Sequence, residues 1–234
     1  MSDLVFVLHR RPYRERSELL KVLGAEGGIY TLVAHGVRSL RPKFHVPEFN
    51  LLHIETSGQG QEPDALQTLL QAQLQESPVQ LQGMAIYMGL YLNELCLVLL
   101  PEQMPCPELF LVYHQTLQEL CTQETLRMEL GLRQFERVLL ELCAHREFFC
   151  IEIEQGRPIQ RDGFYVLTDD SGFVPSGSGY AGADLLDLHT GQWQELRLRQ
   201  LAKQIFRHWL HIHRQGRPLK SRELLRQIWS QLPH

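Results

Sequence analysis

The most regular pattern in this sequence spans residues 4–34, which read LVFVLHRRPYRERSELLKVLGAEGGIYTLVA. Apolar runs at residues 4–8, 17–23 and 29–34 have the length of β-strands, and the last is rich in β-branched and aromatic side chains. Glycines end or separate the runs, as turns do in small all-β folds. We therefore predict that the chain begins with a small β-barrel or sandwich.

Two segments further along determine whether a barrel can close. Residues 49–56, FNLLHIET, predict a fourth strand, although their alternation is less regular. Residues 57–63, SGQGQEP, predict a loop. Residues 64–76, DALQTLLQAQLQE, are ambiguous because Ala, Leu and Gln favour a helix, whereas a closing barrel strand would have to be extended. The residues alone leave both interpretations open.

After Ser77-Pro78 the apolar period changes to that of helices. Between the third and fourth predicted helices, residues 148–174 read as extended, with residues 148–153 as a strand and residues 163–174 as a hairpin. Residues 175–182 then predict a loop. The predicted helices span residues 79–100, 108–121, 125–144, 194–213 and 220–231.

The predicted fold class is therefore α+β. An N-terminal β-barrel domain, residues 1–78, precedes a mainly α-helical C-terminal domain, residues 79–234. The C-terminal domain carries a small β insertion, the hairpin near residues 148–174. A chain of 234 residues is long enough for two modest domains of this kind, each with its own core.

The charge of the chain is unevenly distributed. The formal net charge is -4, but residues 1–50 carry +3 and residues 159–234 carry +3. Residues 51–158 carry -10 between them. Because a nucleic-acid footprint is a local patch, the two basic segments are the places to look for DNA contacts. The acidic middle would instead repel DNA and could bind protein partners.

The cysteines indicate a reducing compartment. Their number is odd, no CxxC pair occurs, and free thiols in a cytoplasm fit this pattern best. The opening MSDLVFVLHRR has too short an apolar run for a secretory signal, and no apolar stretch approaches the length of a membrane span. The cysteines are Cys96, Cys106, Cys121, Cys143 and Cys150.

Basic residues gather between the first two predicted strands and again after the third. With Tyr13 among them, they suit a groove that follows a phosphate backbone and stacks bases. Each arginine offers a planar fork for phosphate. The alternative is a solvated loop with scattered arginines, and both interpretations stay open. The candidate DNA-binding residues here are Arg10, Arg11, Arg14, Arg16, Arg38, Arg41 and Lys43.

A second basic stretch lies between Arg197 and Arg226, where Glu223 is the one acidic residue. Helical spacing places Lys203 and Arg207 on one face. The alternative is the solvated face of an amphipathic helix, which is common. The candidate DNA-binding residues of this stretch are Lys203, Arg207, Arg214, Arg217, Lys220 and Arg222.

Motifs for catalysis or metal binding are missing. The sequence has no P-loop, no G-x-S-x-G, no H-E-x-x-H and no G-x-G-x-x-G, so we predict neither an enzyme nor a cofactor. Two groups of possible ligands lack the paired spacing of zinc sites, and buried thiols and surface histidines explain them more simply, so we predict no metal. The groups are Cys143, His145 and Cys150, and His208, His211 and His213.

The third predicted helix places arginines among apolar residues. Arg133 and Arg137, with Phe135 between them, could hold an acidic peptide that has an apolar end. The alternative is pairing within the helix, of Arg133 with Glu129 and of Arg137 with Glu141. The residues alone favour the pairing.

Four blocks in this order resemble the RecO family of recombination mediators, and the likeness covers nearly the whole chain. The resemblance implies an oligonucleotide/oligosaccharide-binding (OB) fold over residues 1–78, a five-stranded barrel. It therefore also implies a strand within residues 64–76. The blocks are FVLHRRPYRERSELLKVLG (6–24), GIYTLVAHGVRS (28–39), GLYLNELCLVLL (89–100) and GRPLKSRELLRQ (216–227).

The resemblance also implies a function. A protein of this family would bind single- and double-stranded DNA, anneal complementary strands and, with RecR and in some bacteria RecF, place RecA on DNA coated by single-strand-binding protein. It would act in the cytoplasm, in association with the nucleoid. The alternatives are a protein-interaction adaptor with little DNA contact of its own and, less favoured because motifs are missing, a hydrolase or nuclease.

Particular residues match the family's motifs. The GxRS element maps onto Gly36, Arg38 and Ser39, which the resemblance makes the first DNA contacts, with Arg41 following. Many members carry a four-cysteine zinc module, but this chain lacks its CxxC pairs, so the resemblance implies a metal-free hairpin there. The LRxFE element of the third helix, which resembles the dock for the acidic, Phe-ended tail of single-strand-binding protein, maps onto Leu132, Arg133, Phe135 and Glu136.

Overall fold

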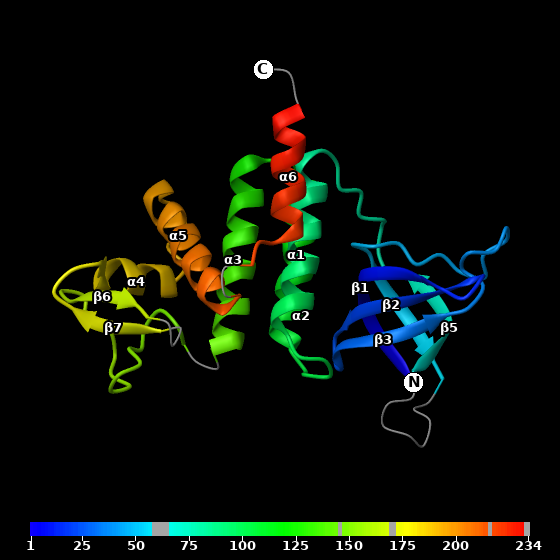
Figure 1. Cartoon of the computed structure of the whole chain (residues 1–234), viewed down its shortest axis with the longest axis horizontal. Coiled ribbons are helices and arrows are strands. Elements are labelled where there is room, and N and C mark those ends of the chain that lie inside the picture. The colour runs from blue at the N-terminus through cyan, green and yellow to red at the C-terminus, as the bar shows by residue number, and fades with distance from the viewer. Residues whose placement is uncertain (58–65, 145–146, 169–171, 215–216, 232–234) are drawn as a thin grey trace. The chain divides into compact units, whose positions relative to one another are not determined.

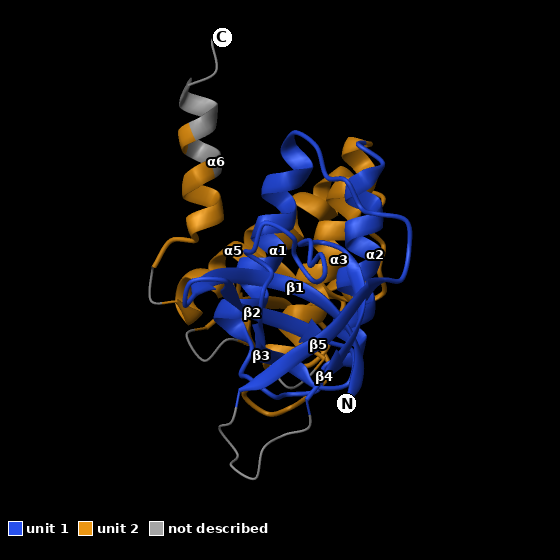
Figure 2. Cartoon of the chain, turned by 90° about the vertical axis from the view of Figure 1, so that its right-hand side faces the viewer, with its two compact units in different colours: residues 1–123 blue, residues 124–234 orange. Residues whose placement is uncertain are grey.

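Two compact units make up the chain (Figure 2). Unit 1 is Met1–Gln123 and unit 2 is Glu124–His234, so the first two helices cluster with the barrel. Compactness does not test independent folding, and the predicted domains stay a prediction. The computed structural model describes residues 1–57, 66–144, 147–168, 172–214 and 217–231.

Unit 1 contains a closed five-stranded barrel with the strand order β1-β2-β3-β5-β4 (Figure 1). Neighbouring strands are antiparallel except β3 and β5, which are parallel. This confirms the OB-fold barrel expected from the sequence. The strands are β1 (Ser2–Tyr13), β2 (Ser17–Gly24), β3 (Gly28–Ala34), β4 (Leu51–Thr56) and β5 (Gln67–Leu74).

The ambiguous segment is a strand, although its helix propensity is high. β5 pairs with both β3 and β4, whose edges would otherwise lack partners, and it buries Leu69 in the barrel core. Ladder hydrogen bonds and burial therefore override local propensity. The core side chains of the other strands include Val5, Leu20, Leu32 and Leu52. The loop predicted over residues 57–63 lies, beyond Ser57, outside the described residues.

Asn93 attaches two helices to the barrel. Its amide donates to the carbonyl oxygen of Leu8 at 2.9 Å, and the hydroxyl of Tyr113 donates to its Oδ1 at 2.6 Å. The register of β1 against β2 shifts between Val7 and His9, so Leu8 sits at an irregularity of the ladder. The side chain of Asn93 is 3% exposed, and buried polar groups need such partners.

The first helix begins later than predicted. α1 spans Met84–Leu99 and α2 spans Pro107–Cys121. The side chain of Asn50 binds the backbone of Val79, accepting from its N–H at 2.8 Å and donating to its carbonyl at 3.4 Å. These bonds hold the start of the predicted segment, residues 79–100, out of the helix.

Unit 2 consists of helices and a small sheet of order β7-β6-β8. The predicted hairpin is confirmed, with Leu167 of β6 opposite Phe173 of β7. No helix in the described ranges is both long and apolar enough to cross a membrane. The elements are α3 (Thr125–Ala144), β6 (Phe164–Leu167), β7 (Phe173–Ser176), β8 (Tyr180–Ala181), α4 (Gly182–His189), α5 (Leu196–His213) and α6 (Lys220–Gln231).

The strand predicted over residues 148–153 is wrong, because residues 148–150 and 153–155 form turns and Ile151 makes an isolated bridge with Pro158. The carboxylate of Glu152 accepts hydrogen bonds from the backbone N–H groups of Glu154, Gln155 and Arg157 at 2.7, 3.0 and 3.0 Å. These hydrogen bonds lower the pKa of Glu152, and the bond from the N–H of Arg157 has the largest effect. A side chain that captures neighbouring backbone donors favours a turn over a ladder.

The loop predicted over residues 175–182 is also wrong in part. It contains the end of β7, all of β8 and the start of α4. Gly182 makes this possible, because a Cβ there would lie 1.9 Å from the carbonyl oxygen of Gln160. Its N–H donates to the carbonyl of Gly163 at 2.8 Å, which draws the segment onto the sheet.

Candidate nucleic-acid interface

Two basic loops are joined on unit 1: the turn between β1 and β2 and the segment that follows β3. The backbone N–H of Arg38 donates to the carbonyl of Arg16 at 3.3 Å. Beside this bond, the hydroxyl of Ser17 lies 2.9 Å from Nδ1 of His35. Arg14 has a φ of 55°, the left-handed conformation that lets the first loop turn tightly. Two segments distant in sequence therefore form one surface.

The second loop is ordered by its own bonds. The hydroxyl of Ser39 lies 2.7 Å from the carbonyl oxygen of Gly36 and 2.8 Å from that of Arg41. Gly36 has a φ of 77°, and a Cβ there would lie 3.7 Å from Cγ of Lys43. Gly36 therefore supplies the turn, Ser39 closes it, and the stem of Lys43 lies over it.

Most of the cations predicted on the barrel are exposed. Within the ranges that the structure describes, no carboxylate forms an ion pair with the exposed cations, so the positive charge of these side chains could meet a phosphate. The exposed cations of the joined loops, called the loop cations below, are Arg11, Arg14, Arg16, Arg38, Arg41 and Lys43.

Arg10 differs from the loop cations. Its Nε donates to Glu18 at 2.8 Å, its Nη2 lies 2.7 Å from the same carboxylate, and its Nη1 donates to the carbonyl of Val46 at 3.4 Å. Nearby, burial raises the pKa of Glu48, although the charge of Arg10 opposes the rise. Arg10 therefore ties β1 to β2, and a phosphate contact from it stays a prediction.

One aromatic side chain accompanies the loop cations. Tyr13, at the end of β1, is half-buried, and the guanidinium carbon of Arg14 lies 5.1 Å from the centre of its ring. Rings and guanidinium planes are the surfaces on which unpaired bases stack. The pair therefore offers an aromatic surface beside the loop cations.

In unit 2, helix α5 carries the second predicted basic set. Lys203 and Arg207 are exposed one turn apart, while Ile205 and Trp209 are buried on the other face. Partial burial and the charges of Arg207 and Arg133 lower the pKa of Lys203. Positive charge is thus concentrated on this part of α5.

The remaining basic residues of this set follow α5. Arg214 is half-buried and donates to the carbonyl of Pro218 at 2.9 Å. Arg217 and Lys220 are exposed, and Arg222 is half-buried. These side chains extend the positive charge of α5 toward the start of α6.

Arg133 on α3 is buried in an ion pair. Its Nη1 lies 2.5 Å from the carboxylate of Glu136, and the two side chains are 7% and 4% exposed. The predicted pairing with Glu129 is wrong, because Glu129 accepts from Nε of Arg199 at 3.0 Å. A tertiary partner has replaced the local one.

The other peptide-binding candidates also lie on α3. Arg137 pairs with Glu141 at 2.8 Å, which confirms the predicted pairing within the helix. The ring of Phe135 has no exposed surface, so any part it takes in a peptide site would come through the packing of α3. The charge of Arg133 is also among the causes that lower the pKa of Lys203, whose side chain is exposed.

Comparisons with known proteins agree with this geometry. The family models "Recombination protein O N terminal" and "Recombination protein O C terminal" match residues 1–78 and 80–143. The DNA repair protein RecO of Methylococcus capsulatus is 37% identical over 97% of this chain and 93% of its own length. The chain belongs to the RecO family. RecO proteins of Cellvibrio japonicus and Tolumonas auensis are 37% and 35% identical over 94% of this chain, and over 94% and 92% of their own lengths.

Membership of the RecO family confirms the resemblance seen in the sequence. It assigns the chain to DNA repair and recombination. The first RecO model ends at residue 78, where the apolar pattern changes from strands to helices. We did not predict from the sequence that Arg10 contacts Glu18. A signal was present, because a hairpin that turns at residues 14–16 places these two residues diagonally across from each other on neighbouring strands.

The thiols of this RecO chain are poor nucleophiles. Burial raises the pKa of Cys143 to about 11, and burial with the nearby carboxylate of Glu147 raises that of Cys150 to about 12. Both are therefore protonated near neutral pH, whereas a reactive cysteine is a thiolate. His145 lies outside the described residues, and the ring of His213 stacks on Trp209 at 4.1 Å.

A hollow of about 320 Å³ in unit 1 lies apart from the loop cations. Asp3 and Glu26 line it, and the hydroxyl of Tyr30 donates to Asp3 at 2.8 Å. Carboxylates at this position would repel phosphate. The hollow therefore does not suit a phosphate backbone, and the predicted DNA contacts stay with the joined basic loops.

Proposed function

We propose that the chain is a recombination mediator of DNA repair that works by binding rather than by catalysis. It binds single- and double-stranded DNA and anneals complementary strands. With RecR, and with RecF where that protein takes part, it helps to load RecA onto single strands coated by single-strand-binding protein. Family membership supplies the repair context, and the joined basic loops carry the proposal for DNA.

The loop cations support DNA binding through counterion release. Arg38 and Arg16 are held together by a backbone bond, and their side chains lack carboxylate partners within the described residues. Phosphates that bind such cations release condensed counterions, which favours binding at low salt. We assign phosphate contacts to the loop cations and a supporting role to Arg10.

Annealing follows from the same chemistry. Two complementary strands repel each other, and cations that neutralise both backbones lower this repulsion. The ring of Tyr13 with Arg14 offers a surface on which an unpaired base can stack without a sequence requirement. The cations of α5 and of the segment after it, from Lys203 to Arg222, would hold DNA in the same manner.

The acidic tail of single-strand-binding protein is the proposed ligand of the α3 and α5 region. Lys203 and Arg207 are exposed there, and the charge of Arg133 acts on Lys203. An acidic peptide brought to Lys203 would relieve the repulsion among these cations. Arg133 supports the site from within, since its guanidinium is paired with Glu136.

Lys203→Ala is expected to weaken binding of a labelled acidic, Phe-ended peptide by about tenfold, since a hydrogen bond to a charged group contributes on the order of 1.5 kcal/mol. Lys203 is exposed, so the change leaves the helix core intact. Fluorescence anisotropy of the peptide measures the effect. Lys220→Ala, which removes the same charge from the same unit, serves as the control, and equal weakening in both variants would contradict the assignment.

Binding of a labelled DNA single strand is expected to depend steeply on salt. If the six loop cations each contact a phosphate, affinity should fall by roughly 300-fold between about 50 and about 200 mM salt, a slope of roughly -4. Anisotropy at a series of salt concentrations measures the slope. Salt-insensitive binding would contradict the proposal, and no binding at low salt would favour the adaptor with little DNA contact.

A further inference from the structure

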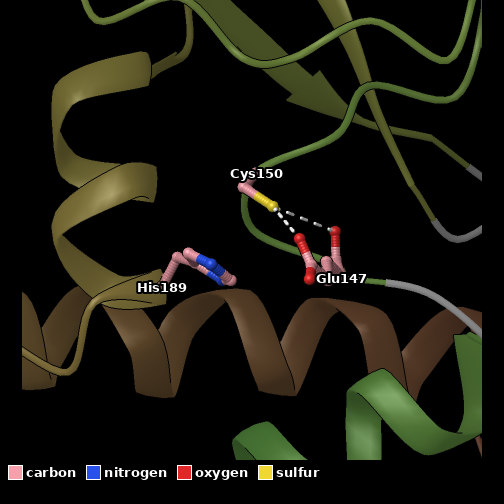
Figure 3. Close-up of side chains that lie close together, drawn as sticks. All are labelled: Glu147, Cys150 and His189. Atoms are coloured by element: carbon pink, nitrogen blue, oxygen red, sulfur yellow. Dashed lines mark hydrogen bonds between the residues drawn. The ribbon is translucent and has the colours of Figure 1, made fainter.

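Three possible metal ligands meet in unit 2 (Figure 3). They are Glu147, Cys150 and His189, and their ligand atoms all lie within 4.8 Å of one another. Glu147 and Cys150 come from the turns after α3, and His189 is the last residue of α4. Cys150 and His189 are half-buried, whereas Glu147 is exposed. The three groups thus combine a thiol, an imidazole and a carboxylate at one place.

The turn that carries two of the ligands is firmly anchored. Phe148 and Phe149, which lie between Glu147 and Cys150 in sequence, are 0% and 2% exposed. The rings of Phe148 and Phe173 pack edge to face at 5.2 Å. This anchoring fixes the backbone under both ligands, as a preformed site requires.

The hydrogen bonds within this cluster leave one imidazole nitrogen of His189 without a partner. The thiol of Cys150 donates to Oε2 of Glu147 at 2.9 Å. Nδ1 of His189 is buried without a hydrogen-bond partner, since its nearest acidic oxygen, Oε1 of Glu141, lies 3.9 Å away. A buried nitrogen without a partner needs an explanation, and a cation is one.

We propose that Glu147, Cys150 and His189 bind one zinc ion, with water in the fourth position. Zinc accepts sulfur, nitrogen and oxygen ligands at about 2.0–2.3 Å in tetrahedral sites. The thiol would lose its proton to solvent as the Zn–S bond forms, and the metal would replace the hydrogen bond to Glu147.

Such a site would tie the C-terminal end of α4 to the turn after α3. It was missed in the sequence because Cys150 and His189 belong to different elements and form no paired motif. The sequence-based prediction that the chain binds no metal rested on the lack of CxxC pairs. A cluster assembled by the fold does not require them.

The test is a titration of the full-length, metal-free chain with Co²⁺, a spectroscopic substitute for zinc. About one equivalent is expected to bind with a thiolate-to-cobalt absorption band, and zinc should displace it. Cys150→Ser should abolish the band. His189→Gln should weaken cobalt binding by at least about tenfold, since the loss even of outer partners costs that much.

Matched controls separate this site from other thiols and histidines. Cys121→Ser and His208→Gln change a half-buried thiol and an exposed imidazole outside the cluster, and both variants should bind cobalt as the wild type does. Wild-type protein without the thiolate band overturns the proposal whether or not the variants fold. Cobalt bound with the same spectrum by Cys150→Ser or with the same affinity by His189→Gln also overturns it.

Discussion

Replacement of both Arg38 and Arg41 with glutamate is expected to weaken binding to a labelled DNA single strand by roughly a hundredfold at about 100 mM salt. Two charge-assisted contacts of about 1.5 kcal/mol each are lost, and two repulsive charges take their place. The salt slope should fall by about 1.4, because about 0.7 of a counterion is released per phosphate contact on a single strand. Anisotropy titrations of variant and wild type measure both quantities.

A second double variant controls for net charge. Arg157→Glu with Arg161→Glu makes the same change in charge on exposed side chains of unit 2. It should leave DNA binding within about threefold of the wild type, since salt screens surface charges that do not contact the DNA. If both double variants lose affinity equally, total charge rather than the loop surface governs binding. If neither loses affinity, the adaptor interpretation gains support.

Asn93→Leu is expected to destabilise unit 1 by about 1–3 kcal/mol, because a buried polar group left without a partner costs about that much. The group concerned is the carbonyl of Leu8, to which the asparagine amide donates at 2.9 Å, and the hydrogen bond from the hydroxyl of Tyr113 at 2.6 Å is lost as well. Leucine has a similar size, so the change tests hydrogen bonding rather than volume. Urea unfolding followed by far-ultraviolet circular dichroism measures the loss.

A second substitution measures how much the hydrogen bond between Asn93 and Tyr113 contributes to stability. Tyr113→Phe in the Asn93→Leu background should cost about 1 kcal/mol less than it does in the wild type, because the hydrogen bond between the two side chains is already lost there. Tyr113→Phe alone should destabilise the wild type, since it orphans Oδ1 of Asn93. If the two substitutions instead add without coupling, the hydrogen bond between them contributes nothing to stability.

The barrel was predictable because its signals are local. Apolar runs with glycine punctuation lie within residues 4–34, and each run became a strand. The exception is β5, whose glutamines and leucines favour a helix and whose extended form depends on the unpaired edges of β3 and β4. Here the family resemblance supplied what propensity could not.

The wrong sequence-based predictions occur where a side chain binds a partner that is distant in sequence or is a backbone group. Glu152 turns residues 150–157 away from a strand by binding three backbone donors, and glutamate in a strand pattern gives no hint of that. Arg133 pairs with Glu136 because Arg199 takes Glu129. Of the candidate site, the basic residues could be listed from sequence, but the bond that joins Arg38 to Arg16 depends on strand register.

That bond between the two basic loops bears on the rate of binding as well as on affinity. A loop backbone held in shape at Arg16, Arg38 and Ser39 before DNA arrives has little backbone entropy left to lose on binding. Encounter with a polyanion is then limited mainly by diffusion and steering. Contacts to phosphates carry no sequence information, so a captured strand can shift its register without a large barrier. Fast capture with easy sliding is what a search for complementary bases requires.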